Sequence, residues 1–107
     1  MEKSKKVALI ASSRMPNNVE FGIFSSAEAK GFFAELIDSL DTKGQTEIIE
    51  EFIDSLDTHN LDVYLNGGPT TMVISLVNAC RNKDINLTAY HWFSDGHNGH
   101  YFPQQVV

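Results

Sequence analysis

The feature that most constrains this chain is a strand that breaks at Asn-Gly-Gly-Pro and restarts as a helix, within LDVYLNGGPTTMVISLVNAC at 61–80. Apolar residues alternate over 61–65, as in a strand, and recur at helical spacing over 72–80. Gly67 and Gly68 permit a positive φ and let a ligand approach the main chain closely. Pro69 suits the first turn of a helix, where its missing N–H costs nothing. We therefore expect a tight strand-to-helix turn.

This turn has two interpretations. Free N–H groups and the positive end of the helix dipole favour an anion, commonly phosphate, beside Thr70 and Thr71. Alternatively, it is an ordinary turn that binds nothing, because two adjacent glycines are less specific than a full phosphate loop. No P-loop lysine and no Gly-x-Ser-x-Gly motif is present, which disfavours an NTPase or a serine hydrolase.

Charge is unevenly distributed along the 107 residues, whose net formal charge is −6. The segment 28–62 holds ten acidic residues against two lysines, and the remainder holds four acidic and six basic residues. The acidic helices are best explained as solvated surfaces. We expect no binding to duplex DNA, whereas a small phosphorylated ligand near the glycine turn remains compatible with the charge.

Length and composition predict a single domain over 1–107 with one core. No apolar run approaches the ~20 residues of a membrane span, and MEKSKK is not followed by a signal-peptide core. Cys80 is the only cysteine and lies on an apolar helical stripe, which favours a packed thiol. We expect a cytoplasmic protein without membrane association.

The order of elements predicts an α/β fold: a three-layer Rossmann-like sheet, mostly parallel, with a C-terminal antiparallel hairpin at one edge. The continuous apolar run at 7–11 predicts an interior strand, and 19–24 is either a short strand or a packed loop. Two helices are expected near 27–40 and 48–56, separated at Gly44. A strand is expected from 85, followed by a turn at 94–99 and a return at 100–102 that Pro103 confines to an edge or ends.

The carboxyl ends of parallel strands meet at one edge of a sheet, where ligands of such folds bind. We expect Ser12 and Ser13, the 66–71 turn, and His91 to meet there. Trp92 could stack on a base, or one of the alternating aromatics Tyr90 and Trp92 could simply be core. The histidines at 91, 97 and 100 do not have zinc-finger spacing, so no metal and no cofactor are expected.

The segments VALIASS at 7–13 and YLNGGPTTM at 64–72 resemble the ligand motifs of CARF domains from CRISPR defence systems. Those domains are Rossmann-like and usually dimeric, and they bind cyclic oligoadenylates. Some of them, the ring nucleases, cleave the ligand. The family's motifs would fall on Ser12–Arg14 and Asn66–Thr71. Pro69 stands where the family usually has threonine, and the frequent phosphate-touching lysine is absent.

The resemblance implies a homodimer that binds a cyclic oligonucleotide and either degrades it, as a metal-independent ring nuclease, or sequesters it. It implies binding by Ser12, Ser13, Arg14, Asn66, Gly67, Gly68, Pro69, Thr70, Thr71 and Trp92. Cleavage can use the ligand's own 2′-OH when held in line, and the residues implied to assist are Ser12, Ser13 and His91. The alternative is a non-catalytic α/β module that binds a nucleotide or a protein.

Overall fold

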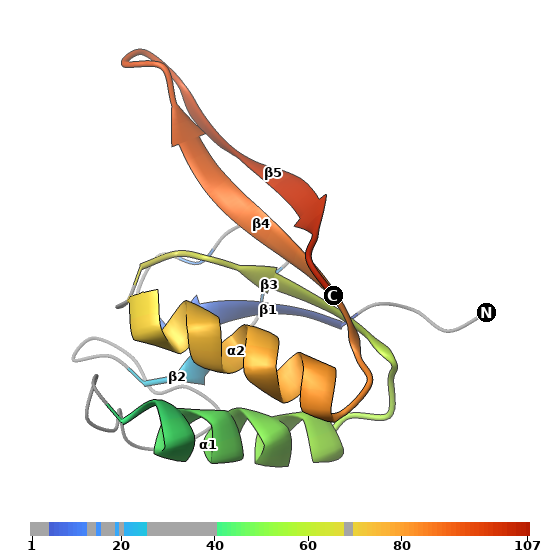
Figure 1. The fold of residues 1–107 in the computed structure, drawn as a ribbon. Helices are drawn as coiled ribbons and strands as arrows, with labels where there is room; N and C mark the ends of the chain where they lie inside the picture. Colours follow the sequence, from blue (N-terminus) through green and yellow to red (C-terminus); the bar gives the residue numbers. More distant parts are fainter. Residues whose placement is uncertain (1–4, 13–14, 16–18, 20, 26–40, 68–69) are drawn as a thin grey trace.

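A computed structural model describes residues 5–12, 15, 19, 21–25, 41–67 and 70–107. A five-stranded sheet has the order β2-β1-β3-β4-β5 (Figure 1). Its strands are β1 (Lys5–Ile10), β2 (Gly22–Phe24), β3 (Asn60–Tyr64), β4 (Asn86–Ser94) and β5 (Gly99–Gln105). The first four run parallel, and β5 runs antiparallel to β4. The predicted mostly parallel sheet with a C-terminal hairpin at its edge is confirmed.

Two described helices, α1 (Thr42–Asp54) and α2 (Thr70–Asn82), pack side by side over the same face of the sheet (Figure 1). They supply one helical layer. The helix predicted over 27–40 lies outside the described residues. The segment 19–24, which the sequence left open between strand and loop, provides β2 as a short strand parallel to β1.

The core lies between the sheet and these helices because alternate strand residues point toward them. Val7, Val63 and Leu87 come from three neighbouring strands and are fully buried with Phe52 of α1 and Leu76 of α2. Polar contacts also join the two helices. The buried hydroxyl of Ser75 in α2 lies 3.0 Å from Gln45 Oε1 and 3.2 Å from the carbonyl oxygen of Thr42, both in α1.

Helix α1 begins earlier than the sequence suggested, and the expectation that Gly44 separates two helices is wrong. The side chain of Asp41 caps the helix by accepting a hydrogen bond from the Gly44 N–H (2.9 Å). A Cβ at position 44 would collide with the Asp41 carboxylate. Glycine is therefore part of the cap, inside the first turn.

Strand β4 is longer than its parallel neighbour. The β3–β4 pairing ends at Tyr64↔Tyr90, whereas β4 continues to Ser94 and pairs only with β5. Residues 91–94 and 99–102 thus form a two-stranded ribbon that rises from the carboxyl edge of the sheet (Figure 1). Pro103 faces Tyr90 between hydrogen-bonded pairs, so its missing N–H points to the open edge. This agrees with the edge position expected for Pro103.

Candidate ligand site at the carboxyl edge of the sheet

Asn66 fixes the geometry of this edge. Its Oδ1 accepts a hydrogen bond from the Ile10 N–H (3.0 Å), and its Nδ2 donates to the Ile10 carbonyl oxygen (2.7 Å). The end of β1 and the glycine turn after β3 are therefore held together, as the sequence predicted for parallel strands. The amide group is already engaged with the main chain. Asn66 thus positions the turn, a role that the sequence did not reveal.

At Gly67 the main chain is open on its outer side. Gly67 has a φ of +124°, and apart from its chain neighbours no atom of the described residues lies within 4 Å of where a Cβ would be. Only glycine adopts this conformation readily, and the absence of a side chain exposes the main chain. Helix α2 begins three residues later, with Thr70 exposed and Thr71 half-buried.

Other residues expected here divide into two groups. Ser12 follows β1 and is half-buried at the same edge, next to the segment that Asn66 holds. Ser13, Arg14, Gly68 and Pro69 lie outside the described residues.

Aromatic side chains form a row on the sheet face away from α1 and α2. The rings of Tyr64 and Tyr90 stack at 4.4 Å, Tyr64 meets Tyr101 edge-on at 5.0 Å, and Tyr101 meets Trp92 at 5.1 Å. Burial raises the pKa of both Tyr90 and Tyr101 above the usual phenol value. Trp92 ends the row on the ribbon and is 57% exposed, so its indole is surface rather than core.

Trp92 is held in place by the strand opposite. A Cβ at Gly99 would collide with the indole ring, so the ring lies across this glycine. The arrangement leaves part of the indole free beyond the carboxyl edge, where the stacking expected from the sequence would need it.

His91 is on the other side of the ribbon. It lines a groove between α2 and the β4–β5 pair, and its buried Nε2 has no hydrogen-bond partner among the residues that the structure describes. Its ring faces Phe102, with centroids 5.7 Å apart. In this arrangement Nε2 is shielded from anything bound on the outer side of the glycine turn.

We next consider Cys80 as a nucleophile and the described His, Cys, Asp and Glu side chains as metal ligands. Cys80 is fully buried, and burial raises the pKa of its thiol to about 12. No group of three or more His, Cys, Asp or Glu side chains in the described part of the chain is placed to hold a metal ion.

At the ribbon tip, the Asp95 carboxylate accepts hydrogen bonds from the backbone N–H groups of Asn98 and His97, and these bonds lower its pKa. Asp95 therefore stabilises the hairpin turn.

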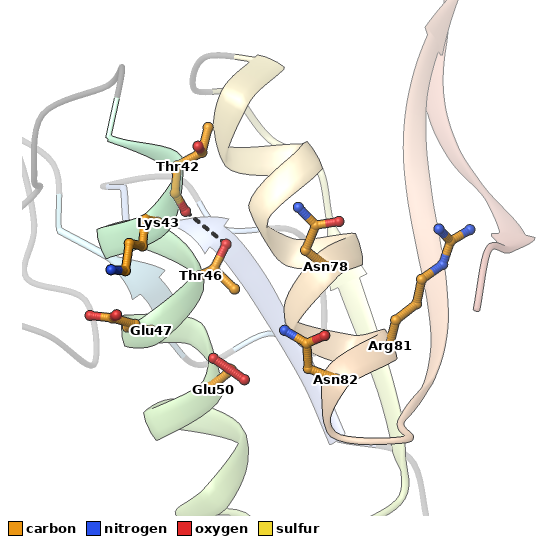
Figure 2. A pocket seen from close by; sticks show the side chains of 8 residues that line it. All are labelled: Thr42, Lys43, Thr46, Glu47, Glu50, Asn78, Arg81 and Asn82. Carbon is orange, nitrogen blue, oxygen red and sulfur yellow. Dashed lines mark hydrogen bonds between the residues drawn. The ribbon is translucent and has the colours of Figure 1, made fainter.

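A second hollow, of about 410 Å³, lies between α1 and α2, away from the glycine turn (Figure 2). In Figure 2, Asn78 and Asn82 extend from α2 toward α1, whereas Arg81 points away. The remaining lining is polar and carries charges of both signs: Thr42, Lys43, Thr46, Glu47 and Glu50. Mixed charges give this hollow no clear preference for an anion. It is better described as the solvated helix surface expected from the sequence.

Comparisons with protein families, curated proteins and solved structures found no match to this chain. No helix in the part of the chain that the structure describes is long and apolar enough to cross a membrane.

Proposed function

We propose that this chain binds a cyclic oligoadenylate at the carboxyl edge of its sheet and sequesters it, as a homodimer. The observation that carries the proposal is the open main chain at Gly67, next to Asn66, which is bonded to the end of β1, and three residues before the start of α2 at Thr70. N–H groups at the start of a helix bind phosphate oxygens well. The CARF resemblance places the family's two ligand motifs on these same segments.

Trp92 supports a nucleotide rather than a bare anion. Its partly exposed indole projects on the ribbon beyond the edge that holds the turn. Stacking of a base on an aromatic ring contributes about 1–3 kcal/mol and tolerates any base. A ligand with several phosphates and several bases would use both features, and two copies of the chain would double them.

Sequestration is favoured over cleavage by the chemistry of the described side chains. Ser12, Asn66, Gly67, Thr70 and Thr71 include no group that titrates near neutral pH. The His91 Nε2 is buried on the helix side of the sheet, so it is a poor general acid or base for a ligand at the turn.

The decisive experiment compares Thr70→Glu with Thr70→Gln in titrations with cyclic tetra-adenylate and cyclic hexa-adenylate. Thr70 is exposed in the first turn of α2. A glutamate there interacts favourably with the helix dipole, by about 0.3–1 kcal/mol, so the fold should be kept or stabilised. The same charge would repel phosphate and weaken binding at least about tenfold, or about 1.4 kcal/mol. The neutral Thr70→Gln variant should bind nearly as the wild type does.

Two results would overturn the proposal. If the wild type and a folded Thr70→Glu protein bound the ligand with equal affinity, no phosphate of the ligand would bind at the turn. Absence of binding to either ring would leave the generic α/β binding module. Linear products accumulating during incubation would instead replace sequestration with ring-nuclease activity.

A further inference from the structure

Exposed apolar side chains gather on one face of the ribbon. Phe93 is 50% exposed, Phe102 is 41% exposed and Val106 is 38% exposed. The β4–β5 register, extended by the bond from the Val106 N–H to the Leu87 carbonyl oxygen, places these three on the face that also carries His91, opposite Trp92 and Tyr101. An isolated two-stranded ribbon is marginally stable in water, and contiguous exposed apolar surface marks a site of contact.

A groove lies at the base of this same ribbon face. Its volume is about 340 Å³, and it runs between α2 and the β4–β5 pair. None of its lining residues is Asp, Glu, Lys or Arg, and most are apolar, among them Leu76, Val77, Leu87, Ala89 and Val106. One chain therefore carries both exposed aromatic rings along the ribbon and an uncharged groove at the ribbon base.

We propose that this face is the interface between two copies of the chain. The two ribbons lie face to face and antiparallel, so that Phe93 of each copy covers the groove of the other and the two Phe102 side chains meet near the two-fold axis. About 20 Å separates Phe93 from Leu87 along β4, at about 3.3 Å per residue. An antiparallel arrangement spans that length and uses the same surface on both copies.

The distribution of charge favours a second copy of the chain over other partners for the ribbon face. The chain carries a net charge of −6, so two copies repel each other overall. From Asn86 to the C-terminal Val107, the only Asp, Glu, Lys or Arg is Asp95. This region is where two such chains can approach without opposing like charges, and an uncharged face offers nothing to an acidic or basic partner.

This interface locates the homodimer of the proposed function, but its argument uses no ligand. The test is therefore made without any oligonucleotide, by sedimentation velocity over a concentration series reaching the millimolar range. The wild type should sediment as a dimer. Phe102→Glu should be monomeric, and Trp92→Glu, the matched change on the opposite ribbon face, should remain a dimer. Circular dichroism confirms that each variant is folded.

A pair of introduced cysteines tests the orientation. His100 and Gln104 are exposed residues of β5, four positions apart and on the same face. Their separation of about 13 Å is too large for a disulfide within one chain, and the native Cys80 is buried. The double variant His100→Cys/Gln104→Cys should form a covalent dimer on oxidation, whereas His100→Cys alone should not.

Several outcomes would overturn this inference. If the wild type were monomeric at all concentrations, the ribbon face would not be an interface between two copies. If Phe102→Glu were still dimeric, the interface would lie elsewhere on the chain. Cross-linking through His100→Cys alone would contradict the antiparallel arrangement. A monomeric wild type that still binds cyclic oligoadenylate would reject this interface and leave the proposed ligand site standing.

Discussion

The side chain of Asn66 bonds to both main-chain groups of Ile10, 56 positions earlier in the chain. Direct pairing of β1 with β3 ends at Ala8↔Tyr64. The Asn66 amide therefore takes over where the strand pairing stops, and it offers one donor and one acceptor as a further strand residue would. This contact keeps two loops of distant origin together at the edge of the sheet.

Replacing Asn66 with alanine should destabilise the protein by about 1–3 kcal/mol, because two hydrogen bonds are lost and the polar groups of Ile10 lose their partner. Urea denaturation gives the free energy of unfolding. Asn86→Ala provides the control, since it removes only an exposed contact to Asn60 (3.1 Å) and should cost less than about 0.5 kcal/mol. Equal costs for both variants would contradict the role assigned to Asn66.

Gly99→Ala should displace the indole of Trp92, because the new Cβ would occupy the position of the ring. The chain has a single tryptophan, so its emission maximum should shift to longer wavelength and its quenching by acrylamide should increase. Gly96→Ala is the matched control. Gly96 has a φ of +95°, and a Cβ placed there would meet no described residue within 4 Å beyond its chain neighbours, so this change costs stability without moving the indole.

Cys80 should resist thiol reagents in the native state and react readily in guanidinium chloride. Burial raises its pKa to about 12, and only the thiolate is an effective nucleophile. Native reactivity comparable to that of the unfolded chain at pH 8 would show that the thiol is accessible.

The same shift predicts a dependence of stability on pH. The native state binds this proton more tightly than the unfolded chain, whose thiol has a pKa of about 8.5. The stabilisation is complete below that pH and is lost as pH rises toward about 12. The difference in unfolding free energy between wild type and Cys80→Ala should therefore shrink over that window, while Tyr90 and Tyr101 titrate in both proteins.

His91→Phe should be neutral or stabilising, by up to about 1 kcal/mol, because in the described part of the chain no group bonds to the buried Nε2. Thermal unfolding checks this expectation against His100→Phe, which changes an exposed ring on the same ribbon face and should have little effect. Binding of cyclic oligoadenylate should survive His91→Phe. A clear loss of stability would show that Nε2 makes a hydrogen bond that stabilises the folded protein.

The sequence predicted the parts of the fold that depend on local pattern. Alternation over 61–65, helical spacing over 72–80 and the position of Pro103 each reflect neighbouring residues, and β3, α2 and the edge strand β5 follow from them. The predicted helix boundary at Gly44 was wrong because the capping aspartate three residues earlier outweighs the low helix propensity of glycine.

Features set by distant residues could not be predicted in this way. The Asn66–Ile10 contact joins segments whose register only the folded sheet defines, so asparagine beside two glycines suggested a ligand contact instead. The burial of His91 and the groove beside α2 depend on how far the hairpin extends past β3. The sequence spacing of the histidines carries no information about that extension.

The β4–β5 hairpin also has a consequence for how the chain folds. Among the described strands it is the one adjacent antiparallel pair, and its turn closes over residues 95–98. A β-hairpin of this kind forms in about 1–10 μs, whereas each parallel pairing must wait for a crossover connection to close. The hairpin should therefore form and reopen many times before the rest of the sheet assembles on it. The rate-limiting step then lies in docking β1 beside β3, where the sequence separation is largest.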